Sequence, residues 1–180
     1  MKKNICYLLL LTILLGCSKD DTEVNRFNGQ ATAFKNGSLF NANVRFDEII
    51  SQPGLFSLHL DVYNEQGFWR ENLFISRLEN VFAEQEIVSN GFDEIDGPSS
   101  NYATLIDDGD VIGDTYNKLN PENNNYFRFT KYDASNGEIE GEFSISLILT
   151  SDDGVGETPT DTLRFSEGRF SAKAERSWFE

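Results

Sequence analysis

A regular alternation of apolar and polar side chains restricts the fold of this chain more strongly than any other feature of its sequence. Across residues 138–149, isoleucine, phenylalanine and leucine alternate with glutamate and serine, the pattern of a strand with one buried face. Residues 55–63 alternate in the same way and place Ser57, His59 and Asp61 on the face away from the core. Because such segments are separated by clusters of turn residues, the sequence predicts an all-β fold, either an antiparallel β-sandwich or a partly open barrel.

The first structured unit is a β-hairpin around Asn36-Gly37. A two-residue type I′ turn needs positive φ at both central residues, and this dipeptide meets that need readily. The turn pairs Ala33 with Phe40 across the two strands. The apolar face of the hairpin is then formed by Ala31, Ala33, Phe40, Ala42, Val44 and Phe46, and the other face carries Asn41, Asn43 and Arg45.

The remaining segments read as strands separated by loops. Residues 74–85 also carry apolar side chains at the spacing of a short helix, but their β-branched neighbours favour a strand that ends near Arg77, followed by an irregular link. Residues 89–101 predict a loop because they are rich in Gly, Asp, Ser and Pro. We expect a bulge at Gly168, where the apolar alternation changes phase. The other expected strands are 102–106, 111–119, 126–132 and 162–172, and we expect the strand at 139–149 near the centre of a sheet.

The N-terminus has the three-part layout of a secretory signal peptide. Lys2 and Lys3 form a positive start, residues 5–15 are apolar apart from Thr12, and the small Gly16 closes the run. The apolar run is too short for a membrane-spanning helix, which needs about 20 apolar residues. We therefore expect residues 1–16 to be removed from the mature protein.

The residues that follow this run carry two short motifs. Leu-Leu-Gly-Cys at residues 14–17 resembles the bacterial lipobox, which implies cleavage between Gly16 and Cys17 and attachment of lipid to the Cys17 sulfur. Several acyl chains such as palmitate hold a protein firmly at a membrane, whereas one binds only marginally. Ser-Lys-Asp-Asp at residues 18–21 resembles the signal that sends Bacteroidota lipoproteins to the outer face of the outer membrane. The two resemblances imply a lipid-anchored protein exposed at the cell surface, with the membrane as its partner.

These motifs divide the chain into four parts. The expected parts are a signal peptide at 1–16, a lipid-anchored flexible tether at 17–29, a single β-sandwich domain at 30–174 and a C-terminal tail at 175–180. Residues 1–16 contain two lysines and no acids, so the remaining 164 residues carry 13 basic against 30 acidic side chains, a formal charge of −17. Such a charge repels nucleic acid, so we expect no nucleic-acid partner.

The supply of chemically versatile residues in the predicted domain is small. No cysteine follows Cys17, which excludes a disulfide or a thiolate metal site, and His59 is the only histidine. The carboxylate of Asp61, two residues along the same strand face, could orient the His59 imidazole, but no Gly-x-Ser-x-Gly nucleophile motif accompanies them. We expect a surface histidine and no enzyme.

Three further signatures strengthen the resemblance to envelope lipoproteins. They are Phe-Lys-Asn-Gly at 34–37 leading to Phe-Asn-Ala at 40–42, Ile-Glu-Gly-Glu-Phe-Ser at 139–144, and Glu-Gly-Arg-Phe-Ser at 167–171. Behind a lipobox, this order is similar to small Bacteroidota surface lipoproteins assigned to domains of unknown function. The resemblance implies a β-rich fold tethered to the cell surface and carries no catalytic residues.

Two groups of side chains are candidates for ligand binding. The densest carboxylate cluster consists of Asp107, Asp108, Asp110 and Asp114, and acidic loops can supply the six to eight oxygen ligands of calcium. The EF-hand spacing fails, because Ile112 falls where a ligand is needed, so a solvated hairpin loop is the alternative. No other cofactor is expected.

The second group is aromatic. Tyr63, Phe68 and Trp69 flank one turn, where exposed rings could stack on the faces of sugars, although packing against the core or its rim is the preferred explanation because aromatic rings are mostly buried. The preferred function is therefore a non-enzymatic, lipid-anchored outer-membrane module for binding or envelope interaction. The alternatives are a carbohydrate-binding accessory lipoprotein of a glycan-uptake system, or a lipocalin-like carrier with phenylalanines around a closed cavity.

Overall fold

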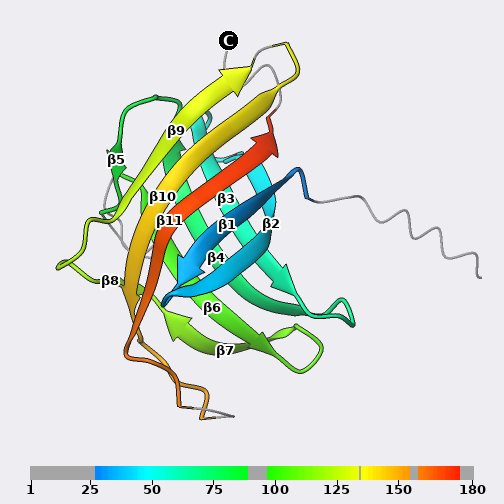
Figure 1. Cartoon of the computed structure of the whole chain (residues 1–180), viewed down its shortest axis with the longest axis vertical. Helices are drawn as coiled ribbons and strands as arrows, with labels where there is room; N and C mark the ends of the chain where they lie inside the picture. The colour runs from blue at the N-terminus through cyan, green and yellow to red at the C-terminus, as the bar shows by residue number, and fades with distance from the viewer. Residues whose placement is uncertain (1–26, 89–96, 134, 155–157, 175–180) are drawn as a thin grey trace, which may run out of the picture.

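The computed structural model describes residues 27–88, 97–133, 135–154 and 158–174. All regular elements in these ranges are β-strands (Figure 1), which confirms the expected all-β class. The strands are β1 Gly29–Lys35, β2 Ser38–Glu48, β3 Leu55–Tyr63, β4 Trp69–Glu79, β5 Gln85–Glu86, β6 Ser99–Ile106, β7 Val111–Tyr116, β8 Lys118–Leu119, β9 Tyr126–Asp133, β10 Glu138–Ile148 and β11 Thr162–Lys173.

The strands form one antiparallel sheet that curls strongly into a half-barrel (Figure 1). Its order is β5-β9-β10-β11-β1-β2-β3-β4-β6-β7, and β8 pairs with β10 beside β9. The curl brings β7, at one end of this order, to the segment just after β10, where Thr115 of β7 pairs with Ser151. There the Thr115 N–H donates to the Ser151 carbonyl at 2.9 Å.

Phenylalanine rings fill the interior of the half-barrel. Phe46 is fully buried and packs its ring 5.3 Å from Phe56, 5.9 Å from Phe129 and 6.3 Å from Phe170, centroid to centroid. Phe127 lies 4.8 Å from Phe129 in an edge-to-face arrangement. Each buried ring removes a large apolar area from water and gains further from such ring pairs, so this cluster is the centre of the core.

The hairpin forms as its turn residues predict. Asn36 and Gly37 both have positive φ, 49° and 83°, and Ala33 lies opposite Phe40 in the register of β1 and β2. The Asn36 side chain also links this turn to β11, because its Oδ1 accepts a hydrogen bond from the Arg164 N–H at 2.8 Å. The turn therefore fixes both the hairpin and its neighbour strand.

Two predicted boundaries are wrong. β4 continues beyond Arg77 to Glu79, because Arg77 adopts a positive φ of 58° and the strand passes through an irregularity instead of ending there. The expected loop at 89–101 gives way to β6 at Ser99, which pairs with Ser76 of β4. Residues 89–96 lie outside the described residues. Serine is a poor signal for a strand, but Ser99 and Ser100 are buried by their neighbours in the sheet.

β11 is bulged where the change of phase predicts it, because Glu167 and Gly168 together lie opposite a single residue of β1. Both neighbouring strands shift register around Glu167, which has a positive φ of 54°. Gly168 meets a different requirement. The ring of Phe143 packs against its backbone so closely that a Cβ atom there would lie 2.5 Å from ring carbons. The phase change in the sequence thus marks the bulge, and the glycine marks a close approach.

Candidate functional site

The predicted lipid attachment site lies outside the described residues. Gly16 and Cys17 precede Phe27, where the description begins, so cleavage and lipidation stay predictions. The expected tether is too long at its C-terminal end, because Asn28 already belongs to the fold. Its side-chain amide donates to the Phe46 carbonyl at 2.8 Å and accepts from the Phe46 N–H at 2.9 Å. This exchange clamps the start of β1 to β2.

The four aspartates proposed for calcium do not form one cluster. Asp107, Asp108 and Asp110 lie at the turn between β6 and β7, where Asp107 and Gly109 have positive φ. A hydrogen bond and charge repulsion from Asp108 raise the pKa of Asp110. Asp114 lies further along β7, and its oxygens group with aspartates from another loop. The hairpin turn separates residues that are close in sequence.

Asp114, Asp152 and Asp153 bring one carboxylate oxygen each within 4.8 Å of one another. The pairing of Thr115 with Ser151 creates this proximity, and Asp114 Oδ1 accepts a hydrogen bond from the Asp153 N–H at 3.1 Å. With one oxygen from each carboxylate, this group supplies three of the six to eight ligands that calcium takes. Asp152 and Asp153 were not predicted as members of this group, because the curl of the sheet brings them to β7.

The three aromatic residues at the β3–β4 turn have different surroundings. The half-buried Trp69 donates its indole N–H to the Glu71 carbonyl at 3.0 Å. One face of Phe68 is covered by the Arg70 guanidinium, 5.5 Å from the ring centroid. Tyr63 is exposed and meets Phe27 edge-on at 5.5 Å. Tyr63 also lines a groove on the outer face of β1, β2 and β3.

The prediction of a surface histidine is wrong. The His59 ring packs 4.4 Å from the ring of Phe74, and burial, assisted by the nearby Arg45, lowers the pKa of His59 to about 3. Asp61 is also buried, and its carboxylate accepts a hydrogen bond from the Asn72 side chain at 2.7 Å. Burial raises the pKa of Asp61. The alternation shows which face these residues occupy, but it does not show that the neighbouring strand covers that face.

A polar cluster spans the inner side of the half-barrel at the hairpin end. Lys35 of β1 pairs with Glu71 of β4 at 2.5 Å, and the Tyr102 hydroxyl of β6 donates to the same carboxylate at 2.8 Å. Burial and the Glu71 charge raise the pKa of Tyr102. The Lys35 ammonium also lies 5.7 Å from the centroid of Phe40. The charges of Lys35 and Glu71 are paired with each other, and the contacts of this cluster link β1 to β4 and β6.

A shallow groove of about 250 Å³ crosses the outer face of β1, β2 and β3. The side chains that line it, here called the β1–β3 groove, are Gln30, Thr32, Asn41, Asn43, Asp61 and Tyr63. Sequence reasoning placed the two asparagines on the outer face of the hairpin but did not predict a groove. The available signal was the run of neutral amide and hydroxyl side chains at alternate positions of β1 and β2.

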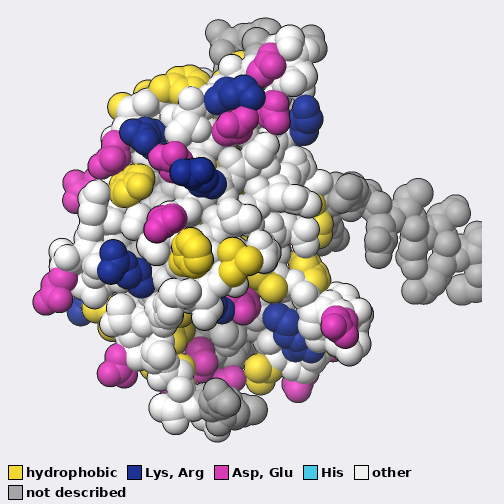
Figure 2. Space-filling model, viewed as in Figure 1, with side chains coloured by type: hydrophobic (Ala, Val, Ile, Leu, Met, Phe, Trp, Pro, Cys, Tyr) yellow, Lys and Arg dark blue, Asp and Glu magenta, His cyan; other side chains and the backbone are white. Residues whose placement is uncertain are grey.

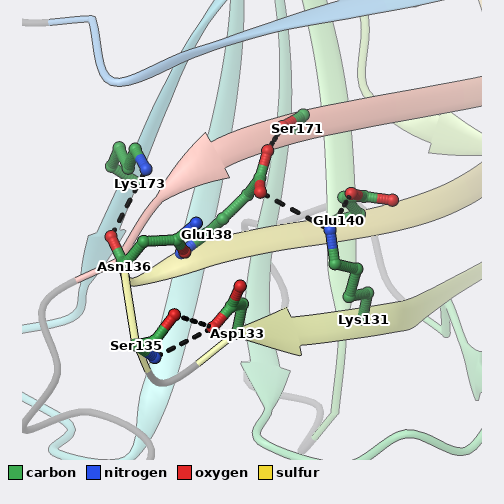
Figure 3. Close-up of polar contacts among 8 residues, drawn as sticks. All are labelled: Lys131, Asp133, Ser135, Asn136, Glu138, Glu140, Ser171 and Lys173. Atoms are coloured by element: carbon green, nitrogen blue, oxygen red, sulfur yellow. Dashed lines mark hydrogen bonds and ion pairs between the residues drawn. The ribbon is translucent and has the colours of Figure 1, made fainter.

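The outer face of β9 and β10, which lie beyond β11 from the groove, is charged. On β9 and β10, Arg128 pairs with Glu142 at 2.7 Å, and Lys131 pairs with Glu140 at 2.7 Å. Figure 3 shows Lys131 between Glu138 and Glu140 beside the turn that joins the two strands. These exposed pairs contribute little to stability, but they make this part of the surface ionic.

Comparison with known proteins gives no family for this chain. No family model, no curated protein and no solved structure matches it. Among the residues that the structure describes, no helix is long and apolar enough to cross a membrane.

Proposed function

We propose that this chain is a lipid-anchored protein of the outer membrane, exposed at the cell surface, whose β domain binds a ligand and is not an enzyme. The anchor is supported by the Leu-Leu-Gly-Cys motif behind an apolar run, with Cys17 as the attachment site. Residues 18–26 lie between Cys17 and the described fold, so Phe27 is ten residues along the chain from the attachment site. Ten residues span at most about 35 Å when extended, which would keep the domain close to the membrane.

The β1–β3 groove is the observation that favours binding over catalysis. It is the part of the described surface where neutral polar side chains from three strands face one depression. The titratable groups that could serve chemistry have structural partners instead. Asp61 accepts from Asn72, His59 packs on Phe74, and burial keeps the imidazole neutral.

The packed interior argues against the lipocalin-like alternative. A carrier for a small apolar ligand needs an internal cavity, whereas Phe46 contacts both Phe56 and Phe129 and all three are almost fully buried. A carbohydrate-binding role would instead use the outer surface, and the β1–β3 groove supports it as the second candidate.

The anchor is tested by comparing Cys17→Ala with Cys6→Ala, since both replace a cysteine near the N-terminus. The wild-type protein and Cys6→Ala should partition into the detergent phase of a membrane extract, and Cys17→Ala should not. Mass spectrometry of the wild-type protein should show a chain that begins at acylated Cys17. An unmodified Cys17 thiol, or an intact segment 1–16, would refute the anchor.

Surface exposure is tested separately with protease on intact cells. The protein should be degraded without lysis, while a periplasmic marker stays intact. Protection of the protein until the outer membrane is opened would place it on the inner leaflet instead.

A further inference from the structure

We infer that the β1–β3 groove is a binding site for an uncharged saccharide. The inference deepens the proposed binding role, and it does not depend on the lipid anchor. It follows from the hydrogen-bonding capacity of the groove, the register of the three strands that form it, its lack of exposed charge and the tyrosine at its rim.

Four side chains in the groove have unused hydrogen-bonding capacity. Gln30, Thr32, Asn41 and Asn43 make no side-chain hydrogen bond within the described residues, and three of the four are exposed. Amides and hydroxyls each donate and accept. A ligand rich in hydroxyl groups offers the same two capacities at every position, so it matches these side chains better than a purely donating or purely accepting ligand does.

The register of the strands arranges these side chains in two rows. Gln30 lies opposite Asn43, which lies opposite Asp61, so one row crosses three strands. Thr32 lies opposite Asn41 in the second row. Neighbouring strands lie about 4.8 Å apart, and alternate residues of one strand about 6.8 Å apart. Hydrogen-bonding groups at these spacings can contact several hydroxyls of one or two sugar rings.

The groove carries no exposed charge of its own, although a quarter of the residues in the chain are charged. Its one carboxylate, Asp61, is buried and bonded to Asn72, and it lies at the floor where it can accept from a ligand hydroxyl. Figure 2 shows dark blue and magenta side chains interspersed over β9–β11, whereas the surface in front of β1 is white and yellow. Arg169, opposite Thr32 on β11, marks the border of this neutral surface. The net negative charge of the chain disfavours acidic sugars.

Tyr63 supplies an aromatic group at the rim. Tyr63 is 37% exposed, and Phe27 packs edge-on against its ring. An amphipathic ring with an accessible face can pack on the C–H face of a sugar while its hydroxyl faces water. The neutral polar side chains can therefore bind the hydroxyls of a saccharide, and the exposed ring beside them can pack on its C–H face.

A peptide ligand fits the groove poorly. Added strands need a free sheet edge, helices need an apolar groove, and phosphorylated segments need clustered arginines. The β1–β3 groove lies on a sheet face between paired strands, its lining side chains are mostly neutral and polar, and it has no arginine in its lining.

The test compares the double variant Asn41→Ala/Asn43→Ala with the wild-type chain and with Thr130→Ala, an exposed polar position on β9. Affinity electrophoresis of the purified full chain would be run in gels that contain dextran, starch, xylan or galactomannan. Polygalacturonate and a casein peptide mixture are the acidic and peptide counterparts. At least one neutral polysaccharide should retard the wild type, and the double variant should bind it at least tenfold more weakly, with Thr130→Ala unchanged.

The double variant should stay folded, because the two asparagine side chains make no hydrogen bond to any other residue that the structure describes, and circular dichroism checks this. Equal retardation of the wild type and the double variant would overturn the site. Binding confined to polygalacturonate or to the casein peptides, or no retardation in any gel, would overturn the ligand class. None of these results bears on acylation of Cys17, so a failure of the groove and a failure of the anchor are distinguishable.

Discussion

Replacing Phe46 with alanine tests whether the half-barrel has a filled interior. The Phe46 side chain is fully buried and has three ring neighbours within 6.3 Å. Truncation of a buried phenylalanine costs about 3–5 kcal/mol, because the transfer free energy is lost and a cavity remains. Each ring pair contributes about 0.5–1.5 kcal/mol beyond its area, which places Phe46→Ala toward the upper part of that range. We expect a loss of about 4 kcal/mol in the free energy of unfolding.

Urea unfolding followed by tryptophan fluorescence measures this loss. With a slope of roughly 2 kcal/mol per molar urea, the midpoint should fall by about 2 M. Phe34→Ala is the matched control, because Phe34 belongs to the adjacent strand but is 40% exposed on the outer face, and it should cost less than about 1 kcal/mol. A cost below about 1 kcal/mol for Phe46→Ala as well would show that the interior has room, and would revive the carrier hypothesis.

Two further predictions concern β11 and His59. Gly168→Ala should destabilise the fold by about 2 kcal/mol, because its Cβ would overlap the Phe143 ring. In the control Gly154→Ala the new Cβ meets open space, so this variant costs only the strain of its φ of 70°. Thermal unfolding of the two variants checks this, and equal costs would contradict the clash. The His59 pKa is lowered to about 3 in the fold, so between pH 6.5 and 3 the histidine is protonated in the unfolded chain but not in the folded one. Lowering the pH through this range therefore reduces the free energy of unfolding by up to about 1.4 kcal/mol per pH unit. In His59→Gln the difference in unfolding free energy between pH 7 and pH 5 should be smaller than in the wild type, and identical differences would show that the histidine is not buried as described.

Local features of the fold were predictable, because they depend on neighbouring residues. The Asn36-Gly37 turn defines its own hairpin register, and the alternation in residues 138–149 predicted β10. The expectation that this strand lies near the centre of the sheet is wrong, because β10 is third from one end of the strand order. The proton-linked role of His59 was not predictable in the same way. Its burial depends on Phe74, a residue of the next strand. The register between two strands cannot be predicted from the sequence of either strand alone.

The candidate site was less predictable than the fold. Asn41 and Asn43 were assigned to the outer face correctly, but a groove depends on the twist of three strands and on how far their side chains reach. The acidic group of Asp114 with Asp152 was missed for a related reason. It exists because the curled sheet brings β7 to the segment after β10, and the sequence predicts strands without predicting how far a sheet curls.

The pairing of β1 with β11 has a consequence for how this protein reaches its folded state. The first strand along the chain lies between β2 and the last one, and Asn28 contacts Lys173 across 145 positions of sequence. During synthesis, one edge of the N-terminal hairpin therefore stays vacant until the C-terminal segment emerges. Contacts over such long sequence separations slow folding, so the exposed hairpin edge is the point at which a holding chaperone would best protect the growing chain.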